Sequence, residues 1–260
     1  MNSKYKVLKY RSNNTNEIDD SISIEEPLEI TIKFKNKETW TENTISITMR
    51  TPGNDEDLVR GFLFNERIIE KIEYIDKIES IGENVGQYNL KNKIIATINN
   101  SENVDIDKIK RNFLTNSSCG VCGKTSLDSL EIIKKDKIIK SLPKIDHEII
   151  MKSPTTLREN QSEFSKTGGI HASGLFSDKG DVVAIKEDVG RHNALDKLIG
   201  YVLEKKLLNP SNQFLTCSGR LNFELVQKAL MSNIGVLIGV GAPTSLALDL
   251  ANKFDMTLVG

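Results

Sequence analysis

Two cysteines separated by two residues are the groups in this sequence best suited to chemistry. Cys119 and Cys122 stand in the segment Ser118-Cys119-Gly120-Val121-Cys122-Gly123, which Lys124 follows. The thiolate is the form that attacks sulfur, and a free thiol with a pKa of about 8.5 is only slightly ionised at neutral pH. The lysine, the glycine amides and a following helix N-terminus would each lower that pKa. The segment therefore predicts a nucleophilic pair able to carry sulfur as a persulfide.

The spacing of the pair by itself leaves other uses open. A zinc site would need two further ligands, and Cys217, His171 and His192 are residues that folding could bring near. A disulfide-forming pair of the thioredoxin type needs a strand before the cysteines and a helix that carries them, whereas a polar stretch precedes them here. A P-loop is excluded because Ser118 stands where its first glycine is required.

Three later segments carry more polar residues than a core requires: Thr167–His171, Glu187–Asn193 and Ser218–Arg220. Arg191, His192 and Arg220 fall at expected junctions from strand to helix, and ligands of α/β sheets bind beyond the carboxyl ends of the strands. Guanidinium groups suit phosphate, and helix N-termini add amide donors. We therefore predict that one rim, which includes Gly169 and His171, binds a phosphorylated ligand. No metal site is predicted.

Each of these segments also has an ordinary structural explanation. Gly168 and Gly169 can end a helix. Glu187 and Asp188 can pair with Arg191 on the surface. A single histidine is more often a structural residue than a catalytic one, and Cys217 is most simply a small core residue at the end of a strand.

The residues before the cysteine pair predict strands and a helix. Apolar and polar residues alternate over 28–34 and 45–49, which is typical of two half-buried strands joined as a hairpin. Residues 55–63 predict a helix, because three acidic residues precede an apolar helical stripe. Residues 94–98 predict a further strand.

After the pair, expected helices and strands alternate. Ser153 and Pro154 are typical of a helix start, and Gly168-Gly169 of a helix end. Further strands are expected over 172–176, 182–185, 214–217, 236–240 and 256–259, and further helices over 195–203, 223–231 and 243–254. This alternation predicts a layered α/β domain with a mainly parallel sheet.

The predicted organisation has three parts. A smaller α+β domain with a flexible N-terminal arm spans residues 1–112, a cysteine loop spans 113–125, and the α/β domain spans 126–260. The arm is expected because residues 12–20 are polar.

Composition excludes several classes of protein. The 260 residues carry a formal net charge of −1, so a broad nucleic-acid footprint is not expected. No apolar run is long enough to span a membrane, and Met1–Arg11 lacks the apolar core of a secretory signal. These features predict a cytoplasmic protein, in which a C-x-x-C pair serves redox, metal or sulfur chemistry more often than a structural disulfide.

In the cysteine segment, the three polar segments and several others, the sequence resembles the formate dehydrogenase accessory sulfurtransferases, the FdhD family. The resemblance runs in order from about residue 25 to the end of the sequence. It rests on these segments: 25–28, 55–63, 117–123, 167–171, 187–197, 218–220, 224–228 and 242–247.

The resemblance implies a three-layer cytidine-deaminase-like fold for the α/β domain, and a homodimer. It implies that a cysteine desulfurase supplies sulfane sulfur to the cysteine loop. The sulfur would pass to molybdenum, or tungsten, in the bis-molybdopterin guanine dinucleotide cofactor, before that cofactor enters the catalytic subunit of formate dehydrogenase. By position Cys119 would carry the persulfide, and Cys122 would assist or resolve it as a disulfide.

The resemblance implies no permanent cofactor. The molybdenum cofactor would bind transiently at Gly169, His171, Arg191, His192 and Arg220, with GDP as a surrogate. Members of the family usually continue beyond the position of Gly260 with a short aromatic and basic tail associated with the guanine dinucleotide. We therefore expect Arg191 and Arg220 to carry more of the binding here.

Two other functions compete with the sulfur carrier. A zinc-dependent nucleotide deaminase, suggested by the implied fold, needs an H-x-E segment and P-C-x-x-C. His171 is followed by Ala-Ser, His192 by Asn-Ala and His147 by Glu-Ile, and residue 118 is serine instead of proline. A non-catalytic chaperone that only escorts the cofactor would use the same rim and would not need Cys119.

Overall fold

The computed structural model describes residues 1–11, 14–36, 38–99, 102, 104 and 142–260, so the predicted cysteine loop with Cys119 and Cys122 lies outside the described residues. The described strands are β1 (Asn2–Arg11), β2 (Asn14–Ser23), β3 (Glu26–Asn36), β4 (Thr39–Arg50), β5 (Ile75–Ile81), β6 (Lys93–Ile98), β7 (His171–Ser177), β8 (Val182–Asp188), β9 (Gln213–Arg220), β10 (Val236–Gly241) and β11 (Thr257–Val259). The described α-helices are α1 (Asp55–Asn65), α3 (His147–Glu159), α4 (Ser162–Thr167), α5 (Arg191–Glu204), α6 (Phe223–Met231) and α7 (Ser245–Lys253). No described helix combines the length and the apolar character that crossing a membrane requires.

The first half of the chain forms a four-stranded sheet in the order β4-β3-β6-β5. Strand β3 pairs antiparallel with β4 and parallel with β6, which confirms the predicted hairpin and the predicted third strand. The alternation predicted for β3 places Leu28, Ile30 and Ile32 in the core, where Leu58 and Leu63 of α1 join them. Helix α1 therefore covers one face of this sheet.

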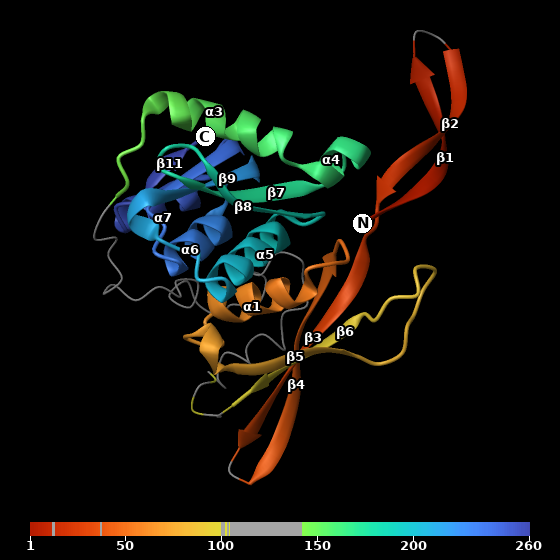
Figure 1. Ribbon diagram of the computed structural model, residues 1–260, viewed down its shortest axis with the longest axis vertical. Coiled ribbons are helices and arrows are strands. Elements are labelled where there is room, and N and C mark those ends of the chain that lie inside the picture. Colours follow the sequence, from red (N-terminus) through yellow and green to blue (C-terminus); the bar gives the residue numbers. More distant parts are fainter. Residues whose placement is uncertain (12–13, 37, 100–101, 103, 105–141) are drawn as a thin grey trace.

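The N-terminal strands β1 and β2 form a separate antiparallel hairpin that projects from the body of the molecule (Figure 1). The sequence predicted a loose arm over part of this segment, whereas the structure pairs ten residues on each side. The base of the hairpin is fastened to α4, because Ser23 Oγ donates a hydrogen bond to Thr167 Oγ1 at 2.7 Å. Asn2 Nδ2 also donates to Glu163 Oε2 at 2.9 Å.

The second half forms a five-stranded sheet in the order β11-β10-β9-β7-β8. Strand β10 is parallel to β9 and β11, whereas β7 is antiparallel to both of its neighbours. Four strands therefore share one direction and β7 runs against them. The sheet is mixed where the sequence predicted a mainly parallel one, because the short turn between β7 and β8 can join only antiparallel neighbours.

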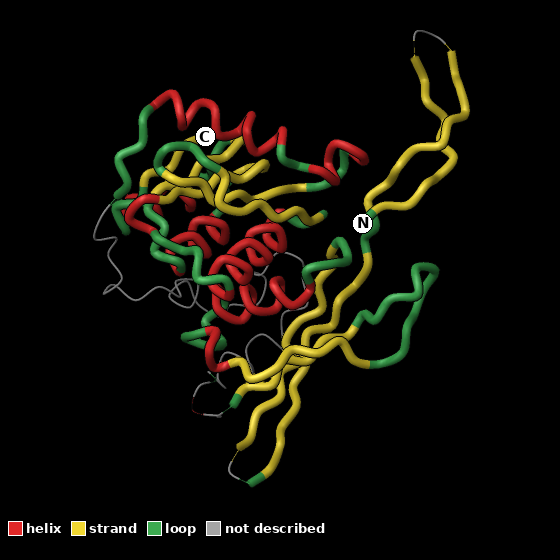
Figure 2. Tube along the Cα trace, viewed as in Figure 1, coloured by secondary structure: helices red, strands yellow, loops and turns green. Residues whose placement is uncertain are grey.

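Helices cover both faces of this sheet, and the whole molecule is built in layers (Figure 2). Leu157 of α3 packs with Phe176 and Phe214 on one face. Helices α5, α6 and α7 pack on the other face, through residues such as Leu198, Leu230 and Leu250. Helix α1 then packs against α5, so α1 and α5 lie between the two larger sheets (Figure 1).

Helix α3 begins six residues before the start predicted at Ser153. Asp146 caps it by accepting a hydrogen bond from the amide of Glu148 at 3.0 Å. Pro154 therefore lies inside the helix and removes one backbone donor. Ser153 Oγ donates instead to the carbonyl of Ile150 at 3.0 Å, the acceptor that an ordinary residue at 154 would use. The predicted diglycine stop is confirmed for α4, where Gly168 has φ 67°.

Two glycines allow α1 and α5 to cross with their backbones in contact. A Cβ on Gly200 of α5 would lie 1.9 Å from the carbonyl oxygen of Asp57, and one on Gly61 of α1 would lie 1.9 Å from the carbonyl oxygen of Asp196. Both distances are far inside van der Waals contact with a backbone atom, so neither helix can accept a side chain here without moving.

Gly200→Ala is expected to lower the free energy of unfolding by about 3 kcal/mol, the upper end of overpacking effects, because helix backbone must shift. Urea denaturation followed by circular dichroism measures the change. Gly169→Ala is the matched control, since its added Cβ would meet only atoms at 3.9 Å. Equal stabilities of the two variants would contradict the close crossing.

Candidate functional site

The junctions that follow β8, β9 and β10 meet at one edge of the five-stranded sheet. His192, in the first turn of α5, lies with its Nε2 atom 3.3 Å from Asn222 Oδ1 and 2.9 Å from Glu224 Oε2. The amide of Thr244 donates to the carbonyl of Leu221 at 2.9 Å, which joins the end of β10 to the end of β9. Segments that are far apart in the sequence therefore share this edge.

His171 lies at the centre of this edge because β7 starts where β9 ends. Its Nδ1 atom is 3.3 Å from Ser218 Oγ, and that hydroxyl also accepts a hydrogen bond from the amide of Ala172 at 2.9 Å. A Cβ on Gly219 would lie 3.3 Å from the His171 ring and 3.6 Å from Arg191 Cδ. His171 and Arg191 thus flank Gly219, where the missing side chain leaves room for both.

The charges at this edge favour an anion. Burial lowers the pKa of His171, and the neighbouring Arg191 and His192 lower it further because positive charge surrounds the ring, while Asp188 opposes them. Arg191 Nε is buried without a hydrogen-bond partner in the described part of the chain. None of the ion pairs formed between described residues involves Arg191 or Arg220. Arginines without a carboxylate partner are suited to bind phosphate.

A pocket of about 570 Å³ opens beside this edge, between α3, α4 and the ends of β7, β9 and β10. Among the predicted ligand-binding residues, Gly169 and His171 line it, next to Ser218. Arg191 is not a lining residue, although it flanks His171. His192 and Arg220 do not line it either, and His192 is engaged with Asn222 and Glu224. The volume falls within the range of small-molecule sites.

The acidic residues expected to pair with Arg191 have different partners. Glu187 accepts hydrogen bonds from the amides of Glu163 and Phe164 at 3.0 and 2.9 Å, and so holds the start of α4. Asp188 is fully buried and pairs with Lys197 at 2.7 Å. The surface explanation is therefore wrong for both residues, and neither carboxylate forms an ion pair with Arg191.

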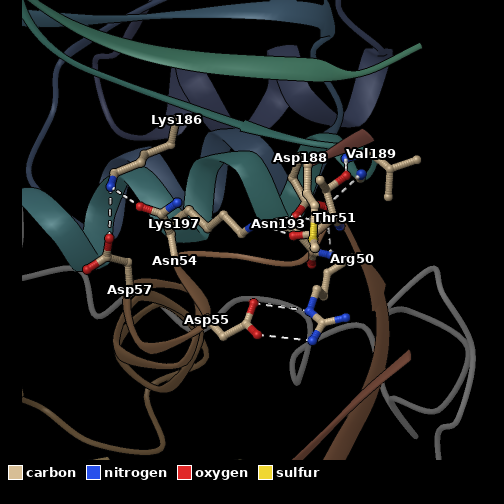
Figure 3. Close-up of polar contacts among 12 residues, drawn as sticks. Arg50, Thr51, Asn54, Asp55, Asp57, Lys186, Asp188, Val189, Asn193 and Lys197 are labelled. Carbon is tan, nitrogen blue, oxygen red and sulfur yellow. Dashed lines mark hydrogen bonds and ion pairs between the residues drawn. The ribbon is translucent and has the colours of Figure 1, made fainter. Parts of the chain in front are cut away.

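Asp188, Asn193 and Lys197 join the edge to the other half of the molecule (Figure 3). Asp188 Oδ2 accepts from the amide of Thr51 at 3.1 Å, and Lys197 Nζ donates to the carbonyl of Thr51 at 2.7 Å. Asn193 Nδ2 donates to the carbonyl of Met49 at 2.8 Å. Burial raises the pKa of Asp188, and the Lys197 ammonium opposes that effect. This network fixes the start of α5, and with it Arg191, against the end of β4.

Sequence reasoning missed this role, although one signal for it was present. Lys197 lies between Leu195 and Leu198 on the apolar stripe of α5. A lysine in such a stripe needs a buried partner. A second pair follows the same pattern: Asp196 accepts from Lys228 at 2.9 Å and from Asn65 of α1 at 2.7 Å.

The third cysteine is unsuited to sulfur chemistry. Cys217 is buried, and burial raises the pKa of its thiol to about 11. It therefore stays protonated at neutral pH and serves as the small core residue that the sequence predicted. Among the residues that the structure describes, no three His, Cys, Asp or Glu side chains are grouped so as to hold a metal ion.

Comparisons with known proteins give one consistent result. The FdhD/NarQ family model matches residues 24–260. A protein of Picrophilus torridus named sulfur carrier protein FdhD is 42% identical over 242 residues, which cover 93% of this chain and 86% of the relative. A protein of the same name from Sulfolobus acidocaldarius is 38% identical over 258 residues, which cover 99% and 91%.

The fold is also similar to a solved structure. A crystal structure from Desulfotalea psychrophila, described as a formate dehydrogenase accessory protein, superposes with a TM-score of 0.66 at 24% identity. The match covers 99% of this chain and 91% of that one. At this level of identity the similarity concerns the fold, while the family model and the closer relatives agree over nearly the whole sequence. The chain belongs to the FdhD/NarQ family.

Proposed function

We propose that this protein is a sulfur carrier that serves formate dehydrogenase, and that Cys119 holds the sulfur as a persulfide. The names of the relatives from Picrophilus torridus and Sulfolobus acidocaldarius support sulfur carriage. The observation that narrows the assignment to the cysteine pair is the burial of Cys217. Because burial raises the pKa of that thiol to about 11, the work falls to Cys119 and Cys122, the only other cysteines in the sequence. Within the pair, Cys119 is proposed because it stands at the position of the family's persulfide carrier.

The loading step is a thiol exchange without net oxidation. The Cys119 thiolate attacks the outer sulfur of a persulfide on a cysteine desulfurase. A new S–S bond forms on Cys119, the S–S bond of the donor breaks, and the donor cysteine leaves as a thiolate. The proton of the persulfide stays on the transferred sulfur.

The release step needs two electrons, and Cys122 supplies them. Its thiolate attacks the inner sulfur of the Cys119 persulfide, a Cys119–Cys122 disulfide forms, and the outer sulfur leaves as hydrosulfide. A cellular dithiol then reduces the disulfide. In this scheme the two cysteines have different roles, because one binds the sulfur and the other expels it.

The proposed acceptor is the molybdenum, or tungsten, bis-molybdopterin guanine dinucleotide cofactor, bound transiently as cargo. The pocket supports this proposal, because Gly169, His171 and Ser218 line it and Arg191 stands beside His171 without a carboxylate partner among the described residues. A guanidinium group and a histidine suit a nucleotide phosphate. Arg220, which is exposed at the end of β9, would attract the same charge.

The remaining parts of the proposal follow the family. The donor would be a cysteine desulfurase, the recipient of the loaded cofactor the catalytic subunit of formate dehydrogenase, and the protein a cytoplasmic homodimer. A cytidine-deaminase-like arrangement is proposed for the second half, supported by helices on both faces of a five-stranded sheet with one reversed strand.

A non-catalytic escort for the cofactor is the second candidate, because the pocket alone would suffice for that role. Incubation with a desulfurase and ³⁵S-cysteine separates the two. A carrier retains label on its chain after the desulfurase is removed, and loses it on treatment with a dithiol. If no label remains on a protein that binds GDP, the escort is the better description.

The pH dependence of nucleotide binding tests the role of His171. Its pKa is lowered in the free protein, and a bound phosphate would raise it, so GDP binding should take up protons and His171 should favour binding as the pH falls toward about 6. Each unit of pKa change contributes at most about tenfold in affinity. Calorimetry in buffers of different ionisation enthalpy counts these protons.

His171→Asn is the matched variant, since it keeps a polar side chain without an ionisable ring. This variant should take up fewer protons when it binds GDP, and the remaining proton uptake then comes from the nucleotide itself. The same proton uptake in both proteins would remove His171 from the site.

A further inference from the structure

The inner wall of the pocket contains an amide nitrogen that has no hydrogen-bond partner in the described chain. Gln161 lies between α3 and α4, lines the pocket and is only 1% exposed. Its Nε2 atom is buried without a hydrogen-bond partner among the described residues. A buried donor without an acceptor is costly, so native proteins rarely keep one unless a ligand or a water completes it.

Two planar side chains line the same pocket as Gln161. Phe164 lines the wall, and the guanidinium Cζ of Arg158 lies 3.7 Å from the centre of its ring. Leu157, Ile170 and Val240 add apolar lining. Guanidinium and aromatic planes are the surfaces on which nucleobases stack.

The phosphate-binding groups belong to a different part of the same pocket. His171 and Ser218 come from the ends of β7 and β9, whereas Gln161, Phe164 and Arg158 come from α3, α4 and the link between them. The first group brings imidazole and hydroxyl, with Arg191 nearby, and the second brings a planar surface and one amide donor. This division matches a nucleotide, which carries charge at one end and a planar ring at the other.

We infer that the Gln161 end of the pocket binds a 6-oxopurine ring, and that Gln161 is the residue that selects it. The inference rests on the proposed function, which makes the ligand a guanine nucleotide, and adds the side chain that reads the base. Guanine and hypoxanthine carry a carbonyl acceptor at position 6, where adenine carries an amino donor. At position 6 only the carbonyl can accept from the free donor of Gln161, whereas the amino group of adenine would place one donor against another.

Binding of GDP, IDP and ADP to the full chain tests this inference by calorimetry. The wild-type protein should bind GDP and IDP at least about tenfold more tightly than ADP, because a mismatched ring leaves the buried amide unpaired. Gln161→Met keeps the length of the side chain. It should weaken the binding of GDP and IDP by about tenfold and change the affinity for ADP by less than about twofold.

Two further variants guard against an effect on folding. Gln161→Glu replaces the donor with an acceptor and should reverse the preference toward ADP. Gln227→Met is the matched control: Gln227 is 4% exposed and also has an unpaired buried amide atom, but it lies on α6 and does not line the pocket. It should leave the GDP-to-ADP ratio unchanged.

The outcomes separate this inference from the proposed function. If wild-type protein binds GDP but the Gln161 variants keep the same ratio of GDP affinity to ADP affinity, the selecting role of Gln161 is wrong. The assignment of the pocket to a nucleotide is then unaffected. The same conclusion follows if Gln161→Met weakens GDP and ADP equally. If wild-type protein binds none of the three nucleotides, the pocket is not the cofactor site, and both the proposed cofactor binding and this inference are wrong. Sulfur loading on Cys119 is decided separately by the ³⁵S experiment.

Discussion

Cys119→Ala is expected to abolish retention of ³⁵S on this protein after incubation with a cysteine desulfurase and labelled cysteine. The transferred sulfur needs a thiolate to attack the donor persulfide. The thiol of Cys217 cannot replace it, because burial raises its pKa to about 11. In cells the same variant should leave formate dehydrogenase inactive, although the cofactor would still be inserted.

The other two cysteines provide the controls for this experiment. Cys217→Ala should load normally, since Cys217 is only 2% exposed and packs in the core. Cys122→Ala should load normally but release sulfur slowly, because the second thiolate is missing. Loss of label in Cys122→Ala with full label in Cys119→Ala would exchange the two roles.

Lys197→Met is expected to lower the free energy of unfolding by about 3–5 kcal/mol, the usual cost of removing one partner from a buried ion pair. The side chains of Lys197 and Asp188 are 2% and 0% exposed, so the variant leaves a carboxylate buried without its cation. The carbonyl of Thr51 also loses the donor that Lys197 Nζ provides at 2.7 Å in the wild-type protein. Urea denaturation at neutral pH measures the loss.

The dependence of this effect on pH identifies its cause. Burial already raises the pKa of Asp188, and without Lys197 the pKa should rise further. A carboxyl group whose folded-state pKa is raised stabilises the fold below its unfolded pKa, and that contribution is lost as pH rises through the folded pKa. The variant should therefore be closest to wild type near about pH 4 and weakest at neutral pH.

A second ion pair between the two halves provides the comparison. Lys186 pairs with Asp57 at 2.9 Å, but these side chains are 14% and 16% exposed. Lys186→Met should cost only about 1 kcal/mol, since water can solvate the remaining carboxylate. Equal losses at Lys186 and Lys197, or a loss at Lys197 that does not change with pH, would contradict the role given to burial.

The network around Lys197 also has a functional consequence. Asp188 ends β8 and Arg191 begins α5. Between them the chain is held against Thr51 of the other half, because Asp188 accepts from the Thr51 amide and the amide of Val189 donates to Thr51 Oγ1. The position of Arg191 beside His171 therefore depends on contacts between the two halves as well as on its own helix. Variants that loosen this contact should weaken nucleotide binding even though they lie outside the pocket.

Most individual elements could be predicted from the sequence, because their signals are local. Alternation in β3 and β4 and the apolar stripe of α5 depend on residues a few positions apart. The start of α3 was misplaced because a serine followed by a proline is a strong local signal, whereas the Asp146 cap and the Ser153 hydroxyl outweigh it in the folded chain.

The sequence by itself determined the candidate chemistry: the cysteine pair, the three polar segments and the elements that carry them. Tertiary structure alone decided which polar residues face a ligand and which hold the fold together. Asp188 and Thr51, separated by 137 residues, are hydrogen-bonded, while the side-chain nitrogen of Gln161 has no hydrogen-bond partner among the described residues. Partners so distant in the chain leave no periodic signal, because their pairing depends on how whole sheets and helices pack.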